Sequence, residues 1–280
     1  MTAAITAAPD SSWQHPLIRP LSRRRLLLST LAGAGAVALA TGPTLAGGGL
    51  HALAAQGAAT PSATGNEDAV ALLTKTSQVM AALETFHFEI ETLSGGDTSM
   101  GVTLESVVGD VRRPTDFQAT IEAKVPFGTI TVRAVGLDGV FSIQNPLATA
   151  TTEGAWMTLS ADNEFFALVN PDIILLLAVQ AVQNATIEGN EKIDGVQTTL
   201  VTGQIDFQEI ASSLGNSDER SEVASQLAAE PVDVLIWIDE ETRVHAIELD
   251  GALLAIDSDT SARMISFSAF NEPVEIAGPE

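Results

Sequence analysis

The sequence predicts an α+β domain whose strands form an antiparallel sheet. Apolar and polar residues alternate in short stretches over most of residues 86–276, which is typical of strands with one buried face. Turn residues such as Asp-Gly recur about every ten residues between these stretches. Helical patterns are few and stand apart from the strands instead of alternating with them, which favours an antiparallel sheet over a parallel one.

The first residues carry the pattern of an export signal. Consecutive arginines from Arg23 precede about sixteen weakly apolar residues, an arrangement that resembles a twin-arginine signal, and Ala52-Leu53-Ala54 offers a small-residue cleavage site. We expect an export signal in residues 1–54, a flexible linker in 55–66 and a folded domain in 67–280. The alternative is a signal that stays uncleaved and anchors the protein.

Residues 67–84 place apolar side chains at helical spacing, and Asn66 or Asp68 can cap the start, so an amphipathic helix is expected there. After this helix, apolar residues recur at every second position, as in strands, and Gly109 is a candidate β-bulge. Strands are expected at residues 86–93, 101–111, 116–125, 128–136, 139–145 and 155–160.

The segment 171–184 is the most apolar helix candidate. Pro171 suits a first helical turn and Asn170 can cap it. Because about nine residues of this segment are apolar on all sides of the helix, it should be covered on more than one face, and Gln180, Gln183 and Asn184 should mark where it reaches solvent. Beyond it we expect a hairpin in 186–207 turning at Asp194-Gly195, a charged helical region in 208–230, and strands at 232–241, 243–251, 252–259 and 262–276.

Composition disfavours some functions and excludes others. Acidic residues outnumber basic ones 36 to 13, giving a net charge of -23, and such a surface repels nucleic acid and anionic lipid. Cysteine is absent, which excludes disulfides, thiolate catalysis, thiolate metal sites and a lipid attached to cysteine. His87 and His245 lie on the polar phase of their strands and are expected to be exposed.

Chemical motifs are also missing from the sequence. It has none of the motifs of serine hydrolases, zinc peptidases or phosphate-binding loops. The carboxylates at 239–241 and 257–259 fit turns, with a weak calcium site as the alternative. We therefore expect no enzymatic activity, no cofactor and no metal.

Four stretches carry a family resemblance. They are "LLTKTSQVMAALETFHFEIET" (72–92), "ATIEGNEKIDGVQTTLVTGQID" (185–206), "VDVLIWIDEETRVHAIEL" (232–249) and "ISFSAFNEPVEIAGPE" (265–280). In this order they resemble the LppX/LprG-type envelope lipoproteins. The resemblance implies a strongly curved antiparallel sheet, a half-barrel similar to LolA and LolB, with helices on its concave side enclosing an apolar cavity. The cysteine that anchors such lipoproteins has no counterpart here.

The resemblance implies an extracytoplasmic, non-enzymatic lipid carrier, secreted or associated with the cell envelope. Its partners would be a lipid or glycolipid with long acyl chains and an envelope lipid exporter, and the protein would be a monomer. The alternative is a scaffold or sensor of the same fold with a filled core. From the apolar character of the residues and their positions in the alternating or helical pattern, we expect the lipid-binding cavity to be lined by Ile121, Ile130, Val132, Phe141, Ile143, Phe165, Phe166, Ile174, Leu177, Ala178, Ala181, Leu235 and Trp237.

Overall fold

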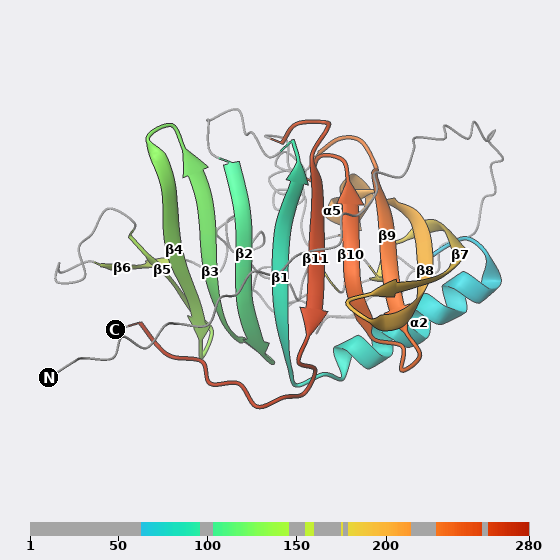
Figure 1. Cartoon of the computed structure of the whole chain (residues 1–280), viewed down its shortest axis with the longest axis horizontal. Coiled ribbons are helices and arrows are strands. Elements are labelled where there is room, and N and C mark those ends of the chain that lie inside the picture. Colours follow the sequence, from blue (N-terminus) through green and yellow to red (C-terminus); the bar gives the residue numbers. More distant parts are fainter. Residues whose placement is uncertain are drawn as a thin grey trace, which may run out of the picture. The chain divides into compact units, whose positions relative to one another are not determined.

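Among the residues that it describes, the computed structural model of the chain contains one open sheet of eleven antiparallel strands, which confirms the predicted sheet (Figure 1). It describes residues 63–95, 103–145, 155–159, 175, 179–213, 228–253 and 257–279. The predicted export signal and most of the linker lie outside these residues. The strands are β1 (Thr85–Ser94), β2 (Thr103–Arg112), β3 (Asp116–Val125), β4 (Gly128–Leu137), β5 (Val140–Gln144), β6 (Trp156–Leu159), β7 (Gln183–Ile193), β8 (Val196–Ile205), β9 (Val232–Asp239), β10 (Val244–Asp250) and β11 (Ala262–Ser268).

The strand order is simple. It runs β6-β5-β4-β3-β2-β1-β11-β10-β9-β8-β7, so β1 to β6 form one half of the sheet and β7 to β11 the other. Pairing of β1 with β11 joins the first and last strands of the chain. Hairpin turns set the register within each half. Asp138 and Gly139, and likewise Asp194 and Gly195, have positive φ, as two-residue hairpin turns require.

Helix α2 (Glu67–Ala81) packs on the β7–β11 half of the sheet (Figure 1). The side chain of Asn66 accepts a hydrogen bond from the N–H of Asp68, which caps the helix as predicted. Leu73 and Met80 face the core and are fully buried. At the far end, the Arg113 guanidinium donates to the backbone oxygens of Met80 and Leu83. A second helix, α5 (Phe207–Ser213), follows β8.

Each face of the sheet has its own apolar cluster. The face that we call the core face carries the larger cluster, which includes Phe88, Phe117, Ile236 and Ile265 together with buried residues of α2. The opposite face carries a smaller cluster of Leu200, Trp237, Ala246 and Met264. Burying a large apolar side chain stabilises the fold by about 1.5–3 kcal/mol, so the core face supplies most of the stability.

Two glycines make room for aromatic rings on the core face. A Cβ atom at Gly109 would lie 2.8 Å from two ring atoms of Phe88, and one at Gly136 would lie 2.3 Å from the ring of Phe117. Gly109 pairs in regular register with Phe88 and Ala119. The predicted bulge at Gly109 is therefore wrong, and this glycine is needed for close packing instead.

Three predicted elements differ in extent. Gln183 and Asn184 begin β7 and do not end a helix; in the preceding segment, Leu175, Val179 and Gln180 are helical, while 171–174 and 176–178 lie outside the described residues. The described part of 252–259 is bend and turn rather than strand, because the Asp257 carboxylate folds back to accept from the N–H of Leu253 at 3.1 Å. The last strand ends at Ser268 and not near 276, since Ala269 and Asn271 have positive φ.

Candidate functional site

Five of the predicted lipid-lining residues share one surface on the core face of β3, β4 and β5. Ile121 pairs with Val132, and Ile130 lies opposite Ala123. Phe141 and Ile143 lie opposite Gly136 and Ala134. Since paired residues point to the same side of a sheet, these side chains form a continuous apolar surface. Its members are Ile121, Val132 and Phe141, which are buried, and Ile130 and Ile143, which are partly buried.

Leu235 and Trp237 do not join this surface. Both belong to the smaller cluster on the opposite face, whereas Ile236 and Ile238 of the same strand face the core. The indole N–H of Trp237 donates to the Glu191 carboxylate at 3.1 Å. The sequence could not choose between the faces, because apolar residues occupy both phases of β9.

The remaining predicted residues belong to the segment before β7. Ala181 is buried in the core cluster together with Leu175 and Val179, which agrees with the predicted coverage of this segment. Phe165, Phe166, Ile174, Leu177 and Ala178 lie outside the described residues, so their place in the site stays a prediction.

One end of the core face carries a charged pair that the sequence analysis missed. Arg263 of β11 donates through two nitrogens to the Asp257 carboxylate, at 2.9 and 2.8 Å, and both side chains are almost fully buried. Arg263 pairs with Thr92 across the sheet, and the Thr92 hydroxyl is buried without a hydrogen-bond partner. The sequence offered one sign of this pair: Arg263 occupies the same phase of its strand as the apolar residues Ile265 and Phe267.

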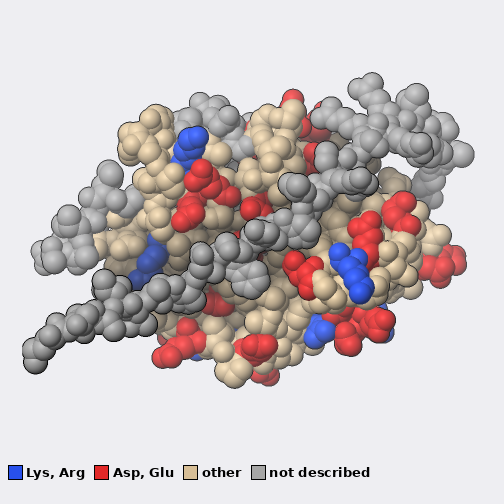
Figure 2. All heavy atoms as spheres, in the orientation of Figure 1, with Lys and Arg blue, Asp and Glu red and all other residues tan. Residues whose placement is uncertain are grey.

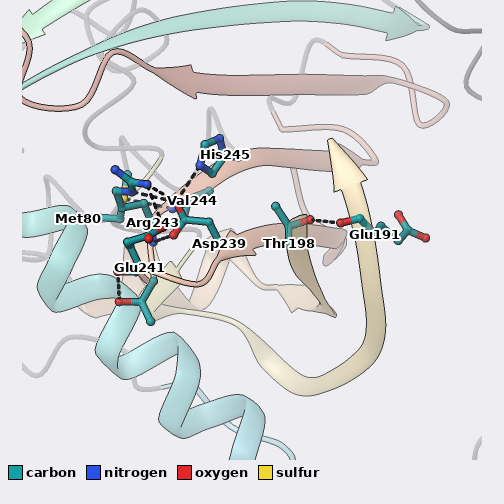
Figure 3. Close-up of polar contacts among 9 residues, drawn as sticks. Met80, Glu191, Thr198, Asp239, Glu241, Arg243, Val244 and His245 are labelled. Atoms are coloured by element: carbon teal, nitrogen blue, oxygen red, sulfur yellow. Dashed lines mark hydrogen bonds and ion pairs between the residues drawn. The ribbon is translucent and has the colours of Figure 1, made fainter. Parts of the chain in front are cut away.

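A second polar cluster surrounds the turn between β9 and β10 (Figure 3). The Asp239 carboxylate accepts from the N–H of Arg243 at 2.7 Å and from the Arg243 Nε at 2.8 Å. It also contacts the His245 Nε2 at 2.9 Å. Burial alone would raise the pKa of Asp239, but these hydrogen bonds from Arg243 and His245 outweigh it and lower the pKa.

This cluster connects three parts of the fold. Phe270, beyond β11, packs edge-on to His245 with ring centroids 5.4 Å apart, and the Arg243 guanidinium lies 5.1 Å from its ring. The Met80 sulfur accepts from the N–H of Val244 at 3.3 Å and so attaches α2 to β10 (Figure 3). The predicted exposure of His245 is wrong, since its side chain is only 14% exposed.

Two histidines form pairs with carboxylates. His87 Nδ1 bonds to Asp110 at 2.8 Å, as His245 does to Asp239. In the described part of the chain, no serine or threonine hydroxyl is hydrogen-bonded to either histidine, as a hydroxyl nucleophile would be. Within the same residues no group of three or more candidate ligands could hold a metal ion. None of the helices described is long and apolar enough to cross a bilayer.

The chain is similar to known proteins. The model of the LppX_LprAFG lipoprotein family matches residues 68–276. The crystal structure of LprF from Mycobacterium bovis is 20% identical in sequence, covers 77% of this chain and 99% of its own, and superposes with a TM-score of 0.52. LppX from Mycobacterium tuberculosis is 21% identical, covers 74% of this chain and 98% of its own, and gives a TM-score of 0.47.

No curated protein sequence matches the chain. The likeness to LprF supports the same fold, and the family model spans most of the region that folds into the sheet and α2. The chain therefore belongs to the LppX_LprAFG lipoprotein family.

Proposed function

We propose that this protein is an extracytoplasmic carrier that holds the acyl chains of a glycolipid or another long-chain lipid against the core face of β3 to β5. The observation that carries this proposal is the continuous apolar surface of Ile121, Ile130, Val132, Phe141 and Ile143. Membership of the lipoprotein family supports it. The helices expected on the same side of the sheet would then enclose the chain, in a cavity between them and the strands.

Transfer of an acyl chain from water to an apolar surface supplies the binding energy in this proposal. Each buried CH₂ contributes about 0.8 kcal/mol, so one long chain supplies on the order of ten kcal/mol before the entropy of association is subtracted. The carrier needs no nucleophile or metal, because the lipid is bound and released unchanged. Its partners would be the lipid and an envelope exporter that delivers or receives it.

A second candidate function has an observation in its favour. Ile121 and Phe141 are only 3% and 2% exposed, as in a core that side chains fill. A scaffold or sensor of the same fold would have such a core and would bind no lipid.

Lipid extraction and uptake separate the two candidates. The full chain is purified from its envelope fraction, native mass spectrometry is used to look for bound lipid, and the delipidated protein is titrated with a fluorescent long-chain acyl probe. A carrier releases lipid on extraction and takes up the probe at a saturable site. A delipidated, folded protein that takes up no probe would contradict the carrier proposal and favour the scaffold.

A matched pair of variants locates the site. Ile130→Gln places a polar group on the proposed surface at a partly buried position, and we expect it to weaken probe uptake several-fold. Ile187→Gln makes the same change at a side chain that is 40% exposed on β7, and uptake should remain as in the wild type. Equal uptake by both variants would place the lipid elsewhere.

A further inference from the structure

The face of the sheet opposite the proposed lipid surface carries a polar groove across β1 to β4. Its volume is about 360 Å³, which lies at the small end of the range of ligand sites, roughly 300–1,000 Å³. His87 pairs with Asp110, Asp110 pairs with Gln118, and Thr120 pairs with Arg133. These cross-strand pairs place all five side chains on one face, side by side along the groove.

Hydrogen bonds organise one end of the groove. Both oxygens of the Asp110 carboxylate are engaged, one with His87 Nδ1 at 2.8 Å and the other by the Gln118 amide N–H at 3.0 Å. The Gln118 oxygen accepts from the N–H of Ala277 at 3.4 Å, which brings the C-terminal segment beside the groove. Since Asp110 acts as the acceptor, Nδ1 of His87 carries a proton, and its Nε2 has no hydrogen-bond partner among the described residues.

Arg133 differs from the other arginines that the structure describes. Each of those donates to an oxygen acceptor: Arg112 to Asp116, Arg113 to backbone oxygens, Arg243 to Asp239 and Arg263 to Asp257. Arg133 has no such acceptor in this part of the chain, and its guanidinium lies 5.7 Å from the ring of Trp156. Packing on an aromatic face restrains the guanidinium and leaves its N–H donors free for a ligand.

We propose that this groove binds a phosphate ester. The Arg133 guanidinium donates to the phosphate oxygens, and the Thr120 hydroxyl and His87 Nε2 lie in the same groove. A guanidinium fork matches phosphate geometry, and a phosphate group offers acceptor oxygens to the Arg133 guanidinium and the Thr120 hydroxyl. The volume leaves room for the group esterified to the phosphate. The ester is either a free small molecule or the headgroup of a phospholipid.

Charge around the groove determines how tightly an anion binds. Acidic side chains are spread widely over the face seen in Figure 2, with few basic ones between them. Salt screens exposed charges beyond about 8 Å, so the nearest groups matter most. The Asp110 carboxylate lines the groove and opposes an anion there. Glu122 lies on the same face of β3, where its pair with Thr131 is next to the Thr120–Arg133 pair, so its carboxylate opposes the anion as well. Removing its charge should therefore tighten binding.

Calorimetric titration of the full chain tests the proposal. The probes are inorganic phosphate, glycerol 3-phosphate and vesicles that contain phosphatidylglycerol, with acetate as a control anion at equal ionic strength. Arg133→Gln should weaken phosphate-ester binding about tenfold or more, since charged hydrogen bonds are lost. Lys124→Gln removes the same charge from an exposed side chain of β3 outside the groove and should change little. Glu122→Gln should tighten binding.

The outcomes show whether the groove binds a phosphate ester and whether that ester is a free molecule or a lipid headgroup. If glycerol 3-phosphate binds and the binding depends on Arg133, a free phosphate ester is a sufficient ligand. If only the vesicles bind in an Arg133-dependent way, the ligand is a lipid headgroup. Absence of saturable binding to all three phosphate probes would overturn the proposal. Equal losses in the Arg133 and Lys124 variants would also overturn it, because they indicate non-specific attraction. Acyl-probe uptake should be unchanged in Arg133→Gln. The phosphate-site proposal and the carrier proposal are therefore tested independently of each other.

Discussion

Replacing Asp239 by asparagine tests whether the polar cluster at the β9–β10 turn holds the fold together. The two side chains have the same shape, so the substitution leaves packing unchanged and alters charge and hydrogen bonding. The wild-type carboxylate accepts from the backbone N–H and the guanidinium of Arg243 and contacts His245. In Asp239→Asn the amide NH₂ faces donors, and at least one of these bonds is lost.

The loss of stability expected in Asp239→Asn follows from how deeply the interacting side chains are buried. The Asp239 side chain is 1% exposed, while Arg243 is 33% and His245 14% exposed. Removing one partner of a fully buried ion pair costs about 3–5 kcal/mol, but water can solvate the partly exposed Arg243 and reduce this loss. We expect the free energy of unfolding to fall by about 2–4 kcal/mol. For a domain of this size that corresponds to a decrease in Tm of roughly 4–16 °C.

The pH dependence gives an independent check. Because the pKa of Asp239 is lower in the folded state than its ordinary value of 3.8, its charge stabilises the fold above that value. This contribution is lost as the pH falls through the folded-state pKa. Urea unfolding of wild type and variant should therefore differ most near pH 6, and the difference should shrink as the pH falls below 3.8. Glu240→Gln, at the exposed neighbouring position, is the control. A difference below about 0.5 kcal/mol, or one that is independent of pH, would refute the reasoning.

Two further substitutions probe the strands. Gly109→Ala places a Cβ 2.8 Å from the Phe88 ring and 2.2 Å from the Gln118 oxygen, so we expect a loss of about 1–3 kcal/mol in urea unfolding; an unchanged midpoint would mean that the ring moves aside freely. Glu248 has its pKa raised by burial, with a smaller contribution from Asp250, so wild-type stability should fall as the pH rises from 4.5 through the raised pKa. Glu248→Gln should remove this decline in thermal unfolding scans between pH 4 and 8, and a decline that persists in the variant would assign it to another group.

Strands with strict alternation were predictable in both extent and face. Residues 116–125 form β3 as expected, and every second side chain from Phe117 to Val125 is buried. The phase of Ile121 therefore identified its face correctly, and the same reasoning placed Val132 and Phe141 beside it. In β9 the apolar residues occupy both phases, and alternation could not show that Trp237 faces away from Ile236.

Contacts between distant parts of the sequence left no local signal. The Asn271 side chain accepts from the N–H of Glu84 at 2.8 Å, and the Thr85 hydroxyl donates to the Glu272 oxygen at 2.7 Å. These bonds attach the chain beyond β11 to the start of β1, where the sequence pattern predicted only a longer strand. The partial burial of His245 has the same cause, because Phe270 packs against it from this segment.

The proposed lipid surface and the proposed phosphate groove lie on opposite faces of the same strands, separated by one layer of backbone. Gly109, Ala119 and Ala134 form part of the groove lining, while Ala119 and Ala134 belong to the core cluster. Small residues thus let the groove approach the core. A Cβ at Gly109 would press on Phe88 of the core face and on the backbone oxygen of Gln118, whose side chain lines the groove. Strain at this one position should therefore reach both surfaces, whereas Arg133 and Ile130 each act on only one.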